Sequence, residues 1–358
     1  MADHLVLFIP GPTEVDEELR QILAMPLLGH RDPKFVATVQ DVCQKLRRLF
    51  LTEQHAAFET CSATALMEAA IRNLVPRGGR TLHLVGGAFG QRWHKVSKSC
   101  GRRAEALEVP LGEAHDPAAL RARLAEGPAP DAVCITHNET STGAIQPLAE
   151  LAAAVRDAAP DALLLVDVVT TLAGAELRFH RWGLDFALAG TQKCLALAPG
   201  LGVYAVSERA LARAAAVEER GFLLDLPKAV ADTNAGKTLA TPCVPLVYAL
   251  QRQLDRIAAE GLDARWRRHL AMRDRTLEWA QGRGFAPFVT DARHRSPTVS
   301  CLDAKGQDVD ALARQALAAG FKLDKGYGDL KGKAFRVGHM GDHAPARLEQ
   351  LLASLGRR

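Results

Sequence analysis

The sequence lacks the features of secreted, disulfide-bonded and membrane-spanning proteins. Its seven cysteines are odd in number, widely scattered, and form no CxxC pair. A disulfide framework or a zinc site is therefore not expected, and no metal site is predicted. The opening residues, MADHLVLFIPGPTEV, contain no basic segment followed by a long apolar one, and no apolar run is long enough to cross a bilayer. We expect a soluble protein of the cytoplasm.

Features of nucleic-acid and nucleotide binding are also missing. The formal net charge is only +4 and the charged residues, 24% of the chain, are interspersed, whereas a nucleic-acid-binding surface gathers basic residues on one face. The densest basic run, residues 264–275, has apolar residues at roughly helical spacing, which predicts a solvated helix face. Neither GxGxxG nor GxxxxGKS/T occurs. A nucleotide-binding module that uses GGAFG as its phosphate loop is therefore a weak alternative.

The sequence does contain a regular alternation of short apolar runs and amphipathic segments. Runs of strand length, bounded by glycine or polar residues, are typical of strands buried on both faces; they are residues 80–87, 131–138, 162–169, 184–190 and 201–207. Helical patterns between them cover residues 90–101, 116–127 and 147–159. This alternation predicts an α/β fold with a mostly parallel sheet covered by helices on both sides.

The pattern changes after Thr241-Pro242. A long helical segment spans residues 245–284 and is expected to break near Gly261. Beyond it, strand-like runs at 296–304 and 335–341 alternate with helical patterns at 309–321 and from about residue 344. The sequence therefore predicts an N-terminal arm (1–15), a large domain (16–261) and a smaller C-terminal α+β domain (262–358).

Two charged residues stand at the ends of predicted strands. Lys193 lies in the almost wholly apolar run ALAGTQKCLALAPGLG. Such a lysine usually extends its ammonium to water, but one that cannot do so has a lowered pKa and becomes a nucleophile. Asp167 ends the apolar run ALLLV, where an unpaired carboxylate is costly to desolvate. It could be a helix cap or a structural ion pair, or the partner of a cationic ligand group.

Three further segments, at residues 61–64, 86–90 and 137–142, follow strands and could reach the same cleft at the carboxyl ends of the sheet. Ser62 and Thr64 open an amphipathic helix, where free N–H groups favour an anion such as phosphate, although both are also common N-caps. Phe89 lies between glycines in GGAFGQRW and could belong to the core or approach a ligand. An amine, a carboxylate and an anion site together suit pyridoxal phosphate.

Nearly the whole chain resembles the class V, fold-type I pyridoxal-phosphate aminotransferases, and among them the alanine–glyoxylate and serine–pyruvate aminotransferases. The matching segments occur in the order of that family; they are PGPTEVDEELRQILAMPLLGHRDPKF, ATALMEAAIRNLV, GGAFGQRW, HNETSTGAIQPL, LLLVDVVTTLAG, GTQK, PGLG, TPCVPLVYAL and FRVGHMG. The resemblance implies a seven-stranded type of sheet, pyridoxal 5'-phosphate as the cofactor, and a homodimer with shared active sites.

The resemblance also implies roles for individual residues. Lys193 would bond covalently to the aldehyde of the cofactor, and Asp167 would pair with its pyridinium nitrogen. Arg336 would grip the α-carboxylate of the substrate with its planar guanidinium. The other implied cofactor contacts are Phe89 stacked on the ring, Thr140 at the ring hydroxyl, Val169 beneath the ring, and Ser62, Ala63, Thr64, Gln192 and the partner subunit's Thr241 at the phosphate.

Two positions depart from the family pattern. The usual Ser-Gly-Thr phosphate turn reads Ser62-Ala63-Thr64 here, so the backbone approach to the phosphate is expected to differ. Thr238 stands three residues before Thr241, where relatives often carry a tyrosine. That replacement weakens the case for the contact between subunits.

The implied activity is a ping-pong transfer of an amino group from a small L-amino acid, alanine or serine, to a 2-oxo acid such as glyoxylate or pyruvate. A phosphoserine aminotransferase acting with 2-oxoglutarate and glutamate is the main alternative. It is suggested by His30 and Arg31, which match a pair that binds substrate phosphate in those enzymes, and by lysines at 325, 331 and 333. The same His-Arg pair occurs in serine–glyoxylate enzymes, and it could equally be a contact between subunits or domains.

A pyridoxal-phosphate lyase of the cysteine desulfurase type is a further alternative. Those enzymes commonly carry histidine before the lysine and need a reactive cysteine on a mobile loop. This chain has Gln192 before Lys193, and Cys194 lies in an apolar run, where a structural thiol is expected. The lyase is therefore the less favoured reading.

Overall fold

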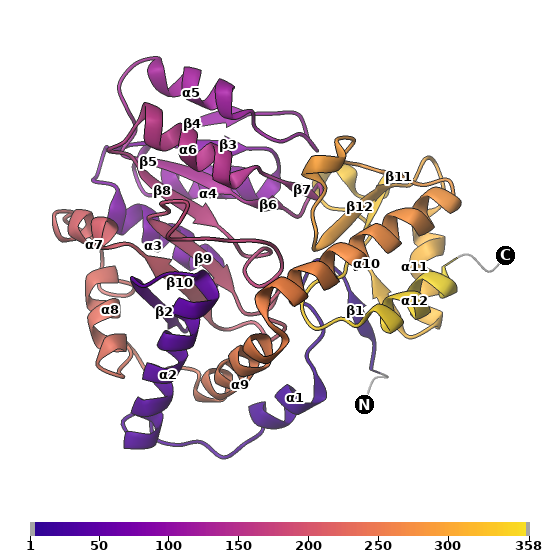
Figure 1. Cartoon of the computed structure of the whole chain (residues 1–358), viewed down its shortest axis with the longest axis horizontal. Coiled ribbons are helices and arrows are strands. Elements are labelled where there is room, and N and C mark those ends of the chain that lie inside the picture. Colours follow the sequence, from indigo (N-terminus) through magenta and orange to yellow (C-terminus); the bar gives the residue numbers. More distant parts are fainter. Residues whose placement is uncertain (1–3, 356–358) are drawn as a thin grey trace.

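The computed structural model of the chain describes residues 4–355 (Figure 1). Residues 1–3 and 356–358, the outermost parts of the predicted arm and small domain, lie outside the described residues. Within residues 4–355, no helix is long and apolar enough to cross a membrane. In the same part of the chain, no group of three or more His, Cys, Asp or Glu side chains could hold a metal ion.

A seven-stranded sheet forms the centre of the larger part of the molecule (Figure 1). Its order is β2-β10-β9-β8-β5-β3-β4. The strands are β2 (His55–Glu59), β3 (Arg80–Val85), β4 (Arg103–Glu108), β5 (Ala132–Thr136), β8 (Leu163–Asp167), β9 (Phe186–Gly190) and β10 (Gly202–Val206). β10 is antiparallel to both of its neighbours, and the other pairings are parallel. The α/β fold with a mostly parallel sheet is confirmed.

Helices cover both faces of this sheet. As a consequence, every residue of β5, β8, β9 and β10 is buried. The helices of this part are α1 (Glu17–Leu23), α2 (Pro33–Phe50), α3 (Ala63–Leu74), α4 (Ala88–Ser99), α5 (Pro117–Ala125), α6 (Leu148–Ala158), α7 (Glu208–Ala215) and α8 (Leu226–Asn234). A short hairpin of β6 (Asn138–Glu139) and β7 (Ala144–Ile145) follows β5. The predicted helices near residues 90, 116 and 147 are α4, α5 and α6.

Two long helices lead into the second part of the molecule. α9 (Val244–Glu260) ends one residue before the predicted break, and α10 (Leu262–Gly282) begins one residue after it. Gly261 between them has φ +81°, a conformation that favours glycine. α10 lies between the two parts of the molecule (Figure 1).

The second part is an α+β arrangement around a small antiparallel sheet in the order β11-β12-β14. Its elements are β11 (Ala286–Pro287), the 3-10 helix η1 (Ala292–His294), β12 (Val299–Asp303), α11 (Val309–Ala318), β13 (Phe321–Leu323), the 3-10 helix η2 (Gly328–Leu330), β14 (Ala334–Gly338) and α12 (Pro345–Ser354). The first strand of the chain, β1 (Val6–Phe8), pairs in parallel with β13. The N-terminal arm therefore belongs structurally with the C-terminal elements.

Buried apolar side chains form two main clusters. The larger one surrounds the seven-stranded sheet and draws its residues from positions 19–257. The second one draws its residues from positions 272–355 and also includes Phe8. The domain division at residues 15/16 and 261/262 stays a prediction, and we propose to keep it, with β1 as a strand that the arm adds to the small domain.

Candidate active site

A cavity of about 250 Å³ lies where β8 and β9 end, at the carboxyl edge of the parallel strands. Nine of the ten residues expected to contact a cofactor line it; they are Ser62, Ala63, Thr64, Phe89, Thr140, Asp167, Val169, Gln192 and Lys193. These residues are spread over 132 positions of the sequence, and the arrangement of the strands in the sheet brings them together. We call this space the inner cavity.

Asp167 is the last residue of β8 and is buried. Its Oδ1 accepts a hydrogen bond from the backbone N–H of Val169 at 2.9 Å, and within residues 4–355 no ion pair includes it. Burial raises the pKa of the Asp167 carboxyl to about 7, and the nearby Glu139 charge adds to this effect. A buried carboxyl without a cationic partner is well suited to receive one from a ligand.

Lys193 follows β9 by three residues and is half-buried, because its side chain faces the inner cavity. Its Nζ donates to the carbonyl of Pro10 at 2.5 Å. Burial, assisted by the positive charge of Arg336, lowers the pKa of Lys193 to about 8. The amine is therefore neutral in a substantial fraction of molecules near pH 8.

The N-terminal segment packs directly on Lys193. Gly11 has φ +130°, and a Cβ at this position would collide with the Nζ and the outer methylene carbons of Lys193. A side chain at residue 11 would thus occupy the space that the lysine uses. The backbone of Gly11 packs against the end of the Lys193 side chain, and the Pro10 carbonyl accepts a hydrogen bond from it. These two contacts hold the amine at the cavity.

The start of helix α3 forms another wall of the inner cavity. Ser62 is the N-cap residue, and its Oγ accepts from the backbone N–H of Ala65 at 3.2 Å. The capping role weighed for Ser62 is therefore present. The hydroxyl groups of Ser62 and Thr64 also line the cavity, so the helix N-terminus offers both side-chain and backbone donors to an anion.

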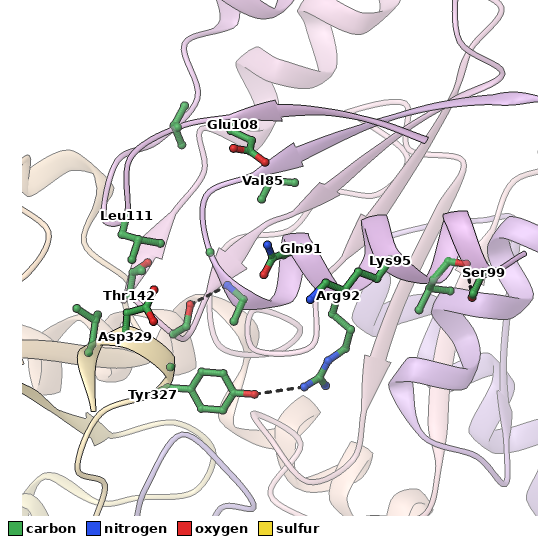
Figure 2. A pocket seen from close by; sticks show the side chains of 17 residues that line it. Val85, Gln91, Arg92, Lys95, Ser99, Glu108, Leu111, Thr142, Tyr327 and Asp329 are labelled. Atoms are coloured by element: carbon green, nitrogen blue, oxygen red, sulfur yellow. Dashed lines mark hydrogen bonds between the residues drawn. The ribbon is translucent and has the colours of Figure 1, made fainter. Parts of the chain in front are cut away.

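Aromatic and cationic side chains alternate at the mouth of the inner cavity. The rings of Phe89 and Tyr327 stack with centroids 5.9 Å apart. The guanidinium of Arg92 lies 4.8 Å from the Phe89 centroid, and that of Arg336 lies 5.3 Å from the Tyr327 centroid. An Arg92 amino group also lies 3.4 Å from the Tyr327 hydroxyl, as Figure 2 shows. These contacts join α4 to the loop before η2.

A second, outer cavity of about 760 Å³ adjoins this mouth (Figure 2). Arg92 and Tyr327 line both cavities. Tyr327 is 39% exposed and extends from the small part of the molecule toward α4 (Figure 2). The two side chains therefore form the partition between bulk solvent and the inner cavity.

Arg336 lies on β14 and is buried, but it is not part of the cavity wall. Its Nε donates to Asp324 Oδ1 at 2.7 Å, and its Nη1 donates to the Thr140 carbonyl at 2.8 Å. Tyr327 covers the guanidinium from the cavity side through the ring contact described above.

Three predicted residues lie elsewhere in this chain. Thr241 is exposed in the loop between α8 and α9, and His30 and Arg31 lie in the loop between α1 and α2; none of the three lines the inner cavity. The lysines at 325, 331 and 333 are also remote from it: Lys325 pairs with Asp310 at 2.6 Å on the surface, and the other two are exposed. The inner cavity of one chain thus holds no basic cluster for a substrate phosphate.

Sequence reasoning gave no individual role to several lining residues, although Asn138 lies in the expected segment 137–142; these residues are Met67, Arg92, Asn138, Thr170 and Tyr327. Arg92 follows Phe89 by three residues on a helix, so its position on the same face was available from the spacing. Asn138 begins β6, and its buried Oδ1 has no hydrogen-bond partner in the described chain. Tyr327 had no comparable signal, because it lies on an irregular loop.

The donor set of the inner cavity matches the chemical groups of pyridoxal phosphate. Lys193 supplies an amine of lowered pKa, Asp167 supplies a buried acid for a ring nitrogen, and the start of α3 supplies anion donors. The orphaned Asn138 Oδ1 adds an unused acceptor. Cys194 points away from this chemistry: its Sγ donates to the Thr170 carbonyl at 3.1 Å, and burial raises the pKa of the thiol to about 12.

Comparison with known proteins identifies the same chemistry. Residues 19–324 match the family model described as aminotransferase class V. An uncharacterized aminotransferase of Methanocaldococcus jannaschii is 36% identical over 94% of this chain and 88% of its own length. An L-aspartate–glyoxylate aminotransferase of Paracoccus denitrificans is 29% identical, with 99% and 93% covered. The crystal structure of an alanine–glyoxylate aminotransferase from Nostoc sp. gives a TM-score of 0.92 at 30% identity, with 99% and 95% covered.

Proposed function

Because the chain belongs to the class V aminotransferase family and is a pyridoxal-phosphate transaminase, we propose that it transfers the amino group of a small L-amino acid, alanine or serine, to glyoxylate. The observation that carries the proposal is that Asp167 and Lys193 line the same cavity. Burial raises the pKa of the acid to about 7 and lowers the pKa of the amine to about 8. Two groups shifted in opposite directions at one site are typical of acid–base catalysis.

The residues that would hold the cofactor are those of the inner cavity. Lys193 would bind its aldehyde, Asp167 its ring nitrogen, and Ser62 and Thr64 its phosphate, with Phe89 against the ring. The bound cofactor supplies an electron-withdrawing ring and a temporary store for the amino group. Every other step of the transfer then depends on side chains of the protein.

Lys193 is the proposed acid–base residue of the transfer. Once the amino acid has displaced it from the cofactor, its neutral amine would remove a proton from the α-carbon of the amino acid and donate a proton to the carbon that had been the aldehyde of the cofactor. Asp167 holds negative charge at the ring nitrogen, where a buried carboxylate interacts strongly. Arg336 binds the α-carboxylate of the substrate through its planar guanidinium, after Tyr327 has moved aside.

Glyoxylate is the favoured amino acceptor because it is common to named relatives with different donors. The Paracoccus protein is named for aspartate and glyoxylate, and the Nostoc protein for alanine and glyoxylate. The size of the inner cavity also suits a two-carbon acceptor beside the cofactor. The phosphoserine alternative has less support, because no basic cluster lines that cavity in one chain.

A homodimer with shared sites is part of the proposal. Thr241 is exposed, and its loop does not contribute to the cavity of its own chain. This position supports the idea that the residue reaches the phosphate site of a second subunit, as the resemblance implies. A fully active enzyme that sediments as a monomer would contradict it. Location in the cytoplasm stays a prediction.

The test is a donor screen with the purified, cofactor-loaded protein. Alanine, serine, phosphoserine, aspartate and glutamate are each added without an acceptor, and loss of the visible absorbance of the lysine-bound cofactor is followed. Glyoxylate, pyruvate or 2-oxoglutarate is then added to restore it. We expect conversion by alanine or serine and recovery by glyoxylate. Conversion by phosphoserine alone, or sulfide release from cysteine, would replace the proposal by one of its alternatives.

A further inference from the structure

Helix α4 begins with residues that cannot cap it. Its N-cap residue is Gly87, which has no side chain to accept a hydrogen bond from the first turn. The cap comes instead from the turn after β5. The backbone N–H of Ala88 donates to Ser141 Oγ at 3.2 Å.

Glu139 supplies the rest of this cap. Its Oε2 accepts from the backbone N–H groups of Phe89 at 2.9 Å and Gly90 at 3.1 Å. Its Oε1 accepts from the hydroxyl of Ser141 at 2.5 Å and from the backbone N–H of the same residue at 3.2 Å. The side chain is 2% exposed. Both carboxylate oxygens are thus used, and neither points to solvent.

The Glu139 side chain packs directly against Gly87. A Cβ added at Gly87 would lie 2.5 Å from Glu139 Cγ and 2.6 Å from Ser141 Oγ. The glycine is therefore required for the approach of Glu139 to the helix, and not only for the conformation of the loop. Negative charge at a helix N-terminus is stabilised by the helix dipole, so an acid suits this position better than a neutral amide.

The turn that carries Glu139 also carries functional groups on its other side. Thr140, the next residue, lines the inner cavity, and its carbonyl accepts from Arg336 Nη1 at 2.8 Å. Phe89 is held by the carboxylate directly and has Arg92 over its ring. One buried side chain therefore connects the ring that faces the cofactor with the turn that anchors the substrate-binding arginine.

We propose that Glu139 is a positioning residue that fixes Phe89 over the cofactor ring by serving as the internal anion of helix α4. The inference rests on the proposed function, because it needs the cofactor in the inner cavity. Glu139 has no contact with the cavity itself within the described chain. It acts through the backbone of residues 89 and 90, and so its effect on cofactor binding must depend on the Phe89 side chain.

The test is a double-mutant cycle with Glu139→Gln and Phe89→Leu. The first readout is the dissociation constant of pyridoxal phosphate, from titration of the cofactor-free protein. The second is the visible circular dichroism of the bound cofactor, which reports the orientation of its ring. We expect Glu139→Gln to weaken cofactor binding about tenfold, because it turns one acceptor into a donor that faces other donors. In the Phe89→Leu background the same change should have an effect below about twofold.

Two further variants separate positioning from general stability. Asp116→Asn removes the charge of another helix-capping carboxylate, at α5, and should leave the cofactor affinity and the dichroism unchanged. Ser141→Ala removes the hydroxyl that caps Ala88 and donates to Glu139, which is a smaller part of the same α4 cap. This variant replaces Glu139→Gln in the test if Glu139→Gln does not fold. It should change both readouts in the same direction, and again only when Phe89 is present.

Equal effects of Glu139→Gln with and without Phe89 would overturn the inference, as would an unchanged dichroism. An effect of Asp116→Asn as large as that of Glu139→Gln would also overturn it. Failure of the unmodified protein to bind pyridoxal phosphate would instead contradict the proposed function. The two failures are therefore distinguishable in the first titration.

Discussion

The floor and the mouth of the inner cavity are built in different ways. The floor consists of Asp167 and Lys193, which stand at or just after the ends of the neighbouring parallel strands β8 and β9. The mouth consists of Phe89, Tyr327 and Arg92, which come from a helix start and an irregular loop and touch through ring contacts. Backbone hydrogen bonds of the sheet fix the floor, whereas the two sides of the mouth, α4 and the loop of Tyr327, meet through side-chain contacts.

This difference assigns different tasks to the two regions. Groups on a rigid sheet keep constant distances, as proton transfer requires. Groups on a loop can move, as the admission of a substrate requires. Changes in the floor should therefore lower kcat, and changes in the mouth and its anchor should raise KM. The predictions below test that division.

Lys193→Ala should have the largest effect, because it removes both the cofactor-bonding amine and the proposed acid–base group. We expect turnover to fall by roughly 10⁴-fold or more, and the visible absorbance of the lysine-bound cofactor to disappear. Steady-state kinetics and an absorbance spectrum check this. Lys331→Ala, at an exposed lysine, is the matched control. Wild-type turnover in Lys193→Ala would contradict the proposed role of Lys193 in catalysis.

Asp167→Asn should have the next largest effect. The amide keeps the shape of the side chain but cannot hold negative charge at the ring nitrogen of the cofactor. We expect kcat to fall by roughly 10²- to 10³-fold, with a KM change below about threefold. A large rise in KM with unchanged kcat would show that the floor contributes to substrate binding, against the division proposed above.

Arg336→Lys tests the anchor behind the mouth. Lysine keeps the positive charge but cannot reproduce two parallel hydrogen bonds to a carboxylate. The KM for the amino donor should rise about tenfold or more, with a smaller change in kcat. Arg347→Lys on the exposed face of α12 should change neither constant. Equal losses in kcat and kcat/KM would instead show that Arg336 interacts with the substrate only in the transition state.

The pH dependence of cofactor uptake tests the lysine of the floor without a substitution. Uptake by the cofactor-free protein requires the neutral amine of Lys193, whose pKa burial lowers to about 8. The uptake rate should therefore fall about tenfold per pH unit well below pH 8 and level off above it. A stopped-flow absorbance series from pH 6 to 10 measures this. A rate that still rises steeply at pH 10 would indicate an ordinary, solvated lysine.

The floor could be predicted from the sequence because its signals are local. A charged residue at the end of an apolar run marks the end of a buried strand, and the ends of parallel strands share one edge. Lys193 and Asp167 were found in this way, and the start of α3 was found from the two hydroxyl residues that open its helical pattern. Their individual contacts could not be predicted, because the partners lie far away in the sequence. One example is the Pro10 carbonyl, which accepts a hydrogen bond from Lys193.

Other features were missed for identifiable physical reasons. β4 reads RAEALE, and as an edge strand it is only half-buried, so it lacks the continuous apolar run of its neighbours. The prediction of a solvated basic helix face at 264–275 was wrong for Arg265, which is buried between Glu260 and Asp342 at 2.7 Å from each. Its acidic partners come from two different segments, and tertiary pairing of this kind is invisible in a helical pattern.

The parallel pairing of β1 with β13 also determines when the site can be completed during synthesis. β1 pairs with a strand that emerges from the ribosome more than 300 residues later, and Phe8 joins a core made of residues from 272 onward. The sheet with Asp167 and Lys193 can form first, since domains fold as their residues emerge. On the other side of residues 10 and 11, the backbone N–H of Thr13 donates to the Gln192 carbonyl at 3.0 Å. The cover that Pro10 and Gly11 place over the lysine is therefore anchored at one end by the sheet domain and at the other by one of the last strands to be made.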